Sequence, residues 1–127
     1  MLSAHPIPLV LGTALWGWTV DEPTCHRLLS HFYRQGGRMV DTATNYPINK
    51  QPADFRRAEN ILARWCQREE VTDLQVIVKV GSVDNLFTPD NNLSPAFLLM
   101  ALDYYRNLFG SNLHTFMIHG LKAYIPF

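Results

Sequence analysis

Short apolar runs alternate along the chain with longer stretches in which apolar residues recur every three or four positions. The short runs lie at residues 7–11, 39–41, 76–80 and 116–118. The third run consists of β-branched residues apart from Lys79, a composition typical of a strand that is buried on both faces of a parallel sheet. The pattern therefore predicts four short strands.

The longer stretches have the spacing of helices with one apolar face. The first begins near Pro23 and ends at Gly36, and its apolar residues follow the i, i+3, i+4, i+7 pattern. The second covers residues 55–65. The third begins at Ser94, a residue type that caps helices well, and ends at Gly110. One amphipathic helix is thus predicted between each pair of consecutive strands.

Strands and helices alternate as βαβαβαβ, and the strands begin about 30 or more residues apart, which is the length of a βαβ unit. Crossover helices between buried strands imply a parallel sheet and an α/β fold. Two architectures fit this order: a small doubly wound sheet, or an incomplete (β/α) barrel of the TIM type. A complete barrel has eight strands and about 250 residues. This chain has 127 residues and supplies about four of the eight β/α units.

Composition limits the classes of function. Acidic and basic residues number 11 each, so the formal net charge is zero, whereas a nucleic-acid or anionic-membrane partner normally requires a basic excess. No apolar run reaches the roughly 18 residues of a membrane span, and the N-terminal stretch lacks the basic start of a signal peptide. Two cysteines, Cys25 and Cys66, give no disulfide framework and indicate a reducing compartment. We therefore expect a cytoplasmic protein without nucleic-acid or membrane partners.

Three predicted strands end in an ionisable residue: Asp41, Lys79 and His119. The carboxyl ends of parallel strands meet on one face, so we expect these side chains to converge, with Tyr46 in the loop above them. A charged residue at one strand end usually marks only a return to solvent. Lys79, however, lies within an apolar run, where burial is costly unless a partner such as Asp41 pairs with it. The four residues together indicate a site.

This group of side chains fits proton transfer to a carbonyl oxygen. A phenol with its ordinary pKa of about 10 is a weak acid at neutral pH, and an adjacent ammonium group, such as that of Lys79, favours the phenolate. Asp41 would keep Lys79 charged, and His119 could orient the substrate oxygen or share the proton. The accompanying hydride cannot come from a side chain, so this chemistry requires a nicotinamide cofactor.

Other cofactor and metal motifs are absent from the sequence. There is no Gly-x-Gly-x-x-Gly after a strand and no phosphate-binding loop, which argues against a Rossmann or P-loop protein. His26 and His31 are five residues apart on one helix and point in different directions, and no cysteine pair has the spacing of metal ligands. We therefore expect no metal site.

Five segments resemble, in sequence and in order, those of a known family. They are Leu11-Gly12-Thr13 with Trp16 and Trp18, Gly36-Gly37, Asp41-Thr42-Ala43 with Tyr46, Val78-Lys79-Val80-Gly81, and Met117-Ile118-His119. Across about residues 9–120 the chain resembles the N-terminal half of an aldo-keto reductase, and the Asp-Thr-Ala-x-x-Tyr stretch is the most specific part.

The resemblance implies a (β/α)8 barrel that reduces aldehydes and ketones to alcohols with NADPH. The catalytic residues that it implies are Asp41, Tyr46, Lys79 and His119, with Tyr46 as the general acid. The implied cofactor-binding residues are Gly12, Thr13 and Asp41. The implied substrate-binding residues are Trp16, Trp18 and His119, although both tryptophans could instead be packing residues.

The resemblance ends after the fourth strand. In the family, strands five to eight and their loops hold most of the adenine, ribose and phosphate groups of the cofactor. We therefore expect residues 1–127 to be the N-terminal half of such a barrel, truncated and of doubtful activity, with residues 121–127 as a non-homologous tail. We expect the isolated chain to bind NADPH weakly or not at all.

Two further hypotheses remain open. The chain could be a catalytically silent fragment, or an unrelated small α/β binding module in which the group of four residues is a coincidence. An open sheet of four strands would leave its edges, at Val10 and Met117, unpaired. Self-association of two copies through these edges is the expected consequence.

Overall fold

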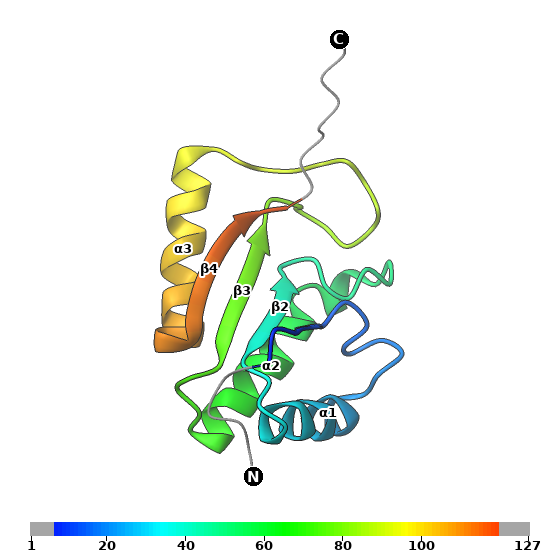
Figure 1. The fold of residues 1–127 in the computed structure, drawn as a ribbon. Coiled ribbons are helices and arrows are strands. Elements are labelled where there is room, and N and C mark those ends of the chain that lie inside the picture. Colours follow the sequence, from blue (N-terminus) through cyan, green and yellow to red (C-terminus); the bar gives the residue numbers. More distant parts are fainter. Residues whose placement is uncertain (1–6, 120–127) are drawn as a thin grey trace.

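Each predicted strand pairs with the next strand along the chain, so the sheet is parallel throughout and has the order β1-β2-β3-β4. The structure is a computed structural model that describes residues 7–119 (Figure 1). The tail expected at residues 121–127 lies outside the described residues. The predicted α/β fold with a parallel sheet is confirmed. The strands are β1 (Val10–Gly12), β2 (Met39–Ala43), β3 (Gln75–Val80) and β4 (Leu113–Ile118).

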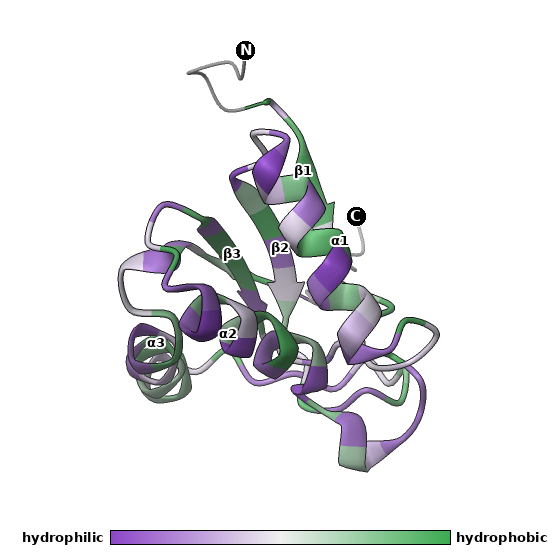
Figure 2. Cartoon of the chain, turned by 90° about the horizontal axis from the view of Figure 1, so that it is seen from below, coloured by the Kyte–Doolittle hydropathy of each residue, from purple (hydrophilic) through white to green (hydrophobic). Residues whose placement is uncertain are grey.

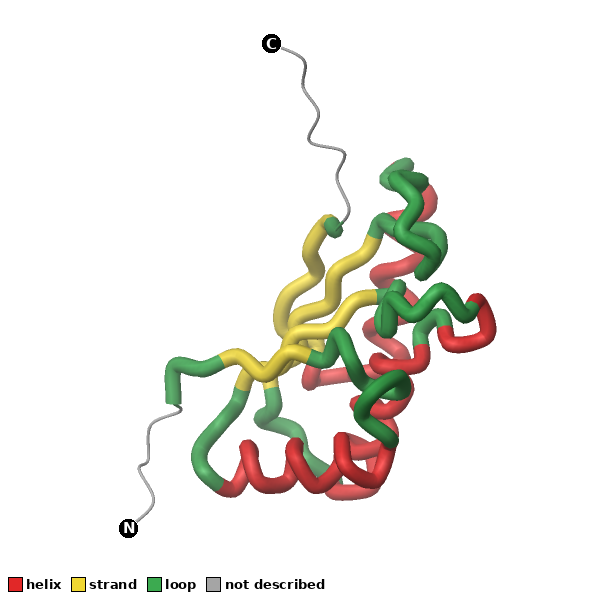
Figure 3. The backbone as a smooth tube through the Cα atoms, turned by 90° about the vertical axis from the view of Figure 1, so that its right-hand side faces the viewer, coloured by secondary structure: helices red, strands yellow, loops and turns green. Residues whose placement is uncertain are grey.

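The helices between the strands distinguish the two predicted architectures. They are α1 (Glu22–Arg34), the short 3-10 helix η1 (Pro52–Asp54), α2 (Arg57–Glu69), α3 (Pro95–Phe109) and the 3-10 helix η2 (Gly110–Asn112). The helices α1, α2 and α3 lie on the same side of the sheet (Figure 3). A doubly wound sheet has helices on both faces, whereas consecutive pairing with an outer layer of helices is the arrangement of a (β/α) barrel. The described residues therefore form an open, four-stranded part of such a barrel.

Side-chain caps explain where two of the helices begin. The Asp21 carboxylate accepts a hydrogen bond of 2.9 Å from the backbone N–H of Thr24, in the first turn of α1. The Ser94 hydroxyl accepts a hydrogen bond of 3.3 Å from the backbone N–H of Phe97, in the first turn of α3. Each cap satisfies a backbone donor that the helix itself leaves free, so these starts could be read from the sequence.

The start of α2 differs from the prediction. Arg56, immediately before the helix, has a left-handed backbone conformation with φ of 68°, so the helix begins at Arg57 and not at residue 55. Two backbone hydrogen bonds hold this entry against the end of β2: Arg56 N–H donates to Thr44 at 2.9 Å, and Ala58 N–H donates to Tyr46 at 3.2 Å. These bonds join residues far apart along the chain, and the apolar spacing of the helix cannot reveal them.

Two strands also have bounds that differ from the predicted runs. β1 begins at Val10 and not at residue 7, because Pro8 has no N–H group to contribute to the ladder. β4 begins at Leu113, three residues before the apolar run that predicted it, because Leu113 already pairs with Val76 of β3.

The core lies between the sheet and the helices. On β3, Val76, Val78 and Val80 are buried beneath the helices, whereas Ile77 and Lys79, on the opposite face, are half-buried. The sequence predicted burial on both faces; the difference arises because α1, α2 and α3 all cover the same face. The strands are mainly apolar, and each helix alternates apolar and polar residues (Figure 2). Half-buried side chains on the helix-free face are thus available for chemistry.

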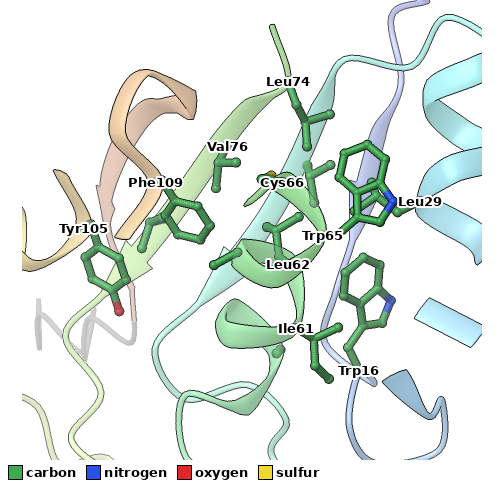
Figure 4. Close-up of a cluster of buried hydrophobic side chains, with 14 of the residues drawn as sticks. Trp16, Leu29, Ile61, Leu62, Trp65, Cys66, Leu74, Val76, Tyr105 and Phe109 are labelled. Carbon is green, nitrogen blue, oxygen red and sulfur yellow. The ribbon is translucent and has the colours of Figure 1, made fainter. Parts of the chain in front are cut away.

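Side chains from the helices fill the layer above the sheet (Figure 4). Leu62 and Trp65 of α2 are fully buried, and Leu29 reaches them from α1. The Trp65 indole N–H donates a hydrogen bond of 2.9 Å to the Ser30 hydroxyl, so the polar atom of this large side chain is satisfied. α2 therefore makes the central contacts of the helix layer.

We expect replacement of Leu62 by alanine to destabilise the chain by about 2–5 kcal/mol, since it removes buried apolar atoms and leaves a cavity. Urea unfolding followed by circular dichroism measures this loss. The control is Leu99→Ala on α3, where the side chain is 66% exposed and the expected change is within about 0.5 kcal/mol. Equal losses in the two variants would contradict the placement of α2 at the centre of the core.

Candidate active site

The carboxyl ends of the strands lie along one edge of the sheet because the strands are parallel and in register. Gly12 of β1 is level with Asp41 of β2, and Lys79 of β3 is level with both Ala43 and Met117. The arrowheads of β2, β3 and β4 accordingly point the same way (Figure 1). Side chains at the ends of different strands can therefore meet at this edge.

Lys79 is at the centre of a group of polar side chains. Its Nζ lies 2.7 Å from Asp41 Oδ1 and donates a hydrogen bond of 2.8 Å to the Tyr46 hydroxyl. The same ammonium group lies 4.7 Å from the centre of the Tyr46 ring. The structure thus brings together three of the four predicted catalytic residues, with Asp41 and Tyr46 on either side of Lys79. The Lys79 side chain is only 13% exposed.

His119, the fourth residue, follows β4 and faces the same group. Its ring centre lies 5.8 Å from that of Tyr46, and the two rings meet edge to face at 83°. Its backbone N–H donates a hydrogen bond of 2.7 Å to Val80. The Nδ1 atom is buried and has no hydrogen-bond partner within residues 7–119. A buried imidazole nitrogen without a partner can bind a further polar group at this position.

The surroundings of Lys79 and His119 shift their pKa values in opposite directions. Burial alone would lower the pKa of Lys79, but its hydrogen bonds to Asp41 and Tyr46 outweigh burial, and the pKa is raised. Burial also lowers the pKa of His119, and the positive charge of Lys79 lowers it further, against the effect of Asp41. At neutral pH the site therefore contains the Lys79 ammonium group, held between the side-chain oxygens of Asp41 and Tyr46, beside a neutral His119 imidazole.

Gly12 and Thr13, at the end of β1, were predicted to bind the cofactor together with Asp41. Gly12 is exposed, and apart from Gly12 and its two chain neighbours no described residue has an atom within 4 Å of the position that a Cβ would occupy, so the surface above it is open. Thr13 is buried, and its hydroxyl donates a hydrogen bond of 3.0 Å to the backbone oxygen of Asp41. Thr13 therefore ties β1 to β2 next to the site, and Gly12 leaves space for a flat group to approach.

The two predicted substrate-binding tryptophans have different environments. Trp16 is only 3% exposed and belongs to the buried core cluster (Figure 4). Trp18, two residues later, is 51% exposed. Trp16 is therefore a packing residue in this structure, whereas Trp18 has surface with which a ligand could make contact.

Asn85, in the loop after β3, is a residue that the sequence pattern did not single out. It is buried, and its side-chain amide donates hydrogen bonds to the backbone oxygens of Pro47 at 3.2 Å and Gln51 at 2.8 Å. It thereby fastens the loop that follows Tyr46. An asparagine in a polar loop usually marks a turn, so the sequence contained no signal for this role.

We also searched the described residues for a metal site and for a reactive cysteine. Between residues 7 and 119, no group of three or more His, Cys, Asp or Glu side chains could hold a metal ion. Cys25 and Cys66 are buried free thiols, and burial raises their pKa values to about 11 and about 12, so neither is an activated nucleophile. In the same part of the chain, no helix is long and apolar enough to cross a membrane.

Two comparisons with known proteins place this geometry in context. The model of the aldo/keto reductase family matches residues 8–124, which includes all four clustered side chains. The chain is also similar to an uncharacterised 11.2 kDa protein in the crtE 3′ region of Pseudescherichia vulneris. The two are 35% identical over 83 residues, which cover 61% of this chain and 78% of that protein.

The electrostatics of the site predict how His119 titrates. We expect its imidazole to titrate below the ordinary value of about 6.5. Because the pKa of His119 is lower in the folded chain than in the unfolded chain, the neutral imidazole contributes stability above the unfolded value of about 6.5. This stability is lost as the pH falls through the folded pKa. In Lys79→Met the pKa of His119 should rise, because a repelling cation is removed and Asp41 remains.

Proton-detected NMR of the histidine rings measures this shift. Lys50→Met is the matched control, since it removes an exposed ammonium group that does not contribute to the pKa shift of His119. A His119 pKa that stays the same in Lys79→Met would contradict the electrostatic effect of Lys79 on His119.

Proposed function

The chain belongs to the aldo/keto reductase family, and from this premise we propose that it provides the catalytic half of an NADPH-dependent reductase that converts aldehydes and ketones to alcohols. Membership of this family supports oxidoreductase activity in general. The proposal of NADPH-dependent carbonyl reduction rests on one observation: the Lys79 ammonium group lies between the Asp41 carboxylate and the Tyr46 phenol. On this proposal, residues 1–127 form the N-terminal half of a (β/α)8 barrel.

Tyr46 would act as the general acid. As the carbonyl is reduced, its oxygen gains negative charge and takes the phenolic proton, and the phenolate that forms is stabilised by the Lys79 ammonium group at 2.8 Å. Asp41 holds Lys79 in its charged form and in position. The neutral His119 imidazole, whose Nδ1 has no partner within residues 7–119, would donate a hydrogen bond to the carbonyl oxygen and orient it. A reduced nicotinamide, when bound, supplies the hydride that adds to the carbonyl carbon.

The residues at the end of β1 fit a nicotinamide ring. Gly12 leaves open space at the edge of the sheet, and a flat ring could lie over it beside Asp41. Thr13 holds the backbone of this edge in place through its bond to Asp41. The proposed cofactor-binding residues are therefore Gly12, Thr13 and Asp41. For the substrate, we propose Trp18 and His119 as contacts, whereas the buried Trp16 packs in the core.

Of the alternatives, an unrelated binding module is not retained, because the chain belongs to the family. A catalytically silent chain remains the second candidate. We further propose that the protein acts on small molecules in the cytoplasm. The two buried free thiols and the zero formal net charge support a reducing compartment without a polyanionic partner.

Replacing Tyr46 by phenylalanine removes the proposed proton donor, together with the hydrogen bond that its hydroxyl accepts from Lys79. We expect kcat for aldehyde reduction to fall by about two to four orders of magnitude, the usual contribution of a general acid. The assay follows the loss of NADPH absorbance with a panel of aliphatic and aromatic aldehydes.

The matched control is Tyr33→Phe. Tyr33 is on α1, and its hydroxyl donates to Asp73 at 2.6 Å, in a contact with no link to the clustered side chains. This variant should keep the wild-type rate. Full activity in Tyr46→Phe would remove Tyr46 from the mechanism, and no turnover by the wild-type chain would favour the silent alternative.

We also propose that two copies associate through the open edges of the sheet. In the described residues, β1 and β4 each pair on one side only, and their edges expose the apolar side chains of Val10, Met117 and Ile118. Unpaired strand edges of this kind tend to pair with other strands, and association would cover both the edges and the apolar residues.

Sedimentation velocity over a range of concentrations tests this association. The wild-type chain should sediment as a dimer or larger species, and Val10→Lys should shift it toward the monomer, since a charged edge opposes pairing. Leu99→Lys, at an exposed apolar position on α3 away from the strand edges, is the control and should associate like the wild type. A stable wild-type monomer at every concentration would overturn the proposal.

A further inference from the structure

Glu59, in the first turn of α2, is a carboxyl group buried behind the site. Its side chain is fully buried in the helix layer. Neither carboxyl oxygen has a well-formed hydrogen bond within residues 7–119, although the Tyr105 hydroxyl is close enough to interact with the group. The nearest cation is Arg56, whose Nη1 lies 3.6 Å from Oε1. Burial raises the pKa of Glu59 to about 7, against the effects of Tyr105 and Arg56, so both protonation states occur near neutral pH.

A chain of polar groups leads from Glu59 to the backbone of Lys79. The Tyr105 hydroxyl, from α3, lies 2.6 Å from the Thr44 hydroxyl, and either can be the donor. The Thr44 hydroxyl can in turn donate to the backbone oxygen of Lys79, at 3.4 Å. The backbone N–H of Thr44 donates to the same oxygen at 3.1 Å. Thr44 directly follows β2, two residues before Tyr46, so this chain of contacts ends at the site.

The protonation state of Glu59 limits the directions that these bonds can take, because each hydroxyl has one proton to donate. Ionised Glu59 can only accept, so Tyr105 donates to it, and the Thr44 hydroxyl then donates to Tyr105. Protonated Glu59 has a proton that it can donate to Tyr105, which can then donate to Thr44, so that the Thr44 proton becomes available for the Lys79 carbonyl oxygen. One proton on α2 thus allows two contacts to reverse, Glu59–Tyr105 and Tyr105–Thr44, and a third to form, from the Thr44 hydroxyl to the Lys79 carbonyl oxygen.

We propose that Glu59 is a positioning residue whose proton sets the direction of the hydrogen bonds through Tyr105 and Thr44, and thereby determines whether the Thr44 hydroxyl holds the backbone at Lys79. With Glu59 protonated, the Lys79 carbonyl oxygen accepts from both the hydroxyl and the N–H of Thr44. With Glu59 ionised, Thr44 donates to this oxygen through its N–H alone. The effect on carbonyl reduction rests on the proposed function; the reversal of the bonds does not.

The charged and titratable groups around Glu59 come from two elements in the described residues. Arg56 precedes the same helix, and Tyr105 faces the carboxyl group from α3. Tyr104, also on α3, contacts Arg56 instead, with the guanidinium carbon 4.4 Å from the ring centre. β3 turns only valine side chains toward the helix layer. Arg56 and Tyr105 remain in one charge state through neutral pH, so Glu59 is the group that titrates there.

Carbon-detected NMR of the full 127-residue chain, without substrate or cofactor, tests the proposal. The carboxyl carbon of Glu59 should titrate with a midpoint of about 7, and the carbonyl carbon of Lys79 should shift with the same midpoint. In Tyr105→Phe the chain of bonds is broken, so Glu59 should still titrate while the Lys79 carbonyl no longer follows. Tyr104→Phe, which removes the neighbouring hydroxyl, is the matched control and should keep the coupled transition.

Glu59→Gln separates this effect from the titration of histidines, since all five histidines remain. The Lys79 carbonyl transition should be lost in this variant. A Lys79 carbonyl that does not shift in the wild type, or that shifts equally in Tyr105→Phe, would overturn the proposal. The comparison of the wild type with Tyr105→Phe decides the question even if Glu59→Gln does not fold. Because no turnover is measured, a chain without reductase activity would leave this result intact.

Discussion

An ammonium group within a run of apolar strand residues is costly in free energy unless its charge is compensated, and the site is arranged around this constraint. Asp41 and Tyr46 compensate the charge of Lys79 at 2.7 Å and 2.8 Å. Both partners come from the neighbouring strand and the loop that follows it, so the contacts form only when β2 and β3 are parallel and in the observed register. The compensation of the Lys79 charge therefore depends on the correct pairing of β2 with β3.

The features that could be predicted from the sequence depend on local rules. Apolar runs of strand length, separated by amphipathic helices, predicted the parallel sheet, and the alignment of strand ends predicted that Asp41 and Lys79 would meet. Trp16 marks the limit of this reasoning. An aromatic residue just after a strand can point into the core or across the site, and the sequence pattern is the same in both cases. Only the packing around α2 decides that Trp16 is buried.

Residues whose role depends on distant backbone groups could not be found this way. Asn85 donates to carbonyl oxygens 34 and 38 residues away, and those oxygens come within reach only after folding. Glu59 is a different case. A charged residue among the apolar positions of a helix is the same kind of signal that singled out Lys79 in its strand, and the same argument about burial applies to it. The signal was present in the sequence, but the partner, Tyr105, lies on another helix.

One face of the sheet packs against the helices, the other bears the side chains of the site, and Thr44 connects the two. Alternate residues of β3 point toward the helix layer or toward the open face, so the valines contribute to stability while Lys79 is available for chemistry. Thr44 contacts Tyr105 of the helix layer and also the backbone oxygen of Lys79. A change in the protonation of a buried group can therefore reach the open face without movement of a helix, since hydroxyl rotation is sufficient. Asp41 and Tyr46 fix the position of Lys79 through its side chain. The Thr44 hydroxyl contacts its backbone oxygen, in a bond that on our proposal depends on the protonation of Glu59.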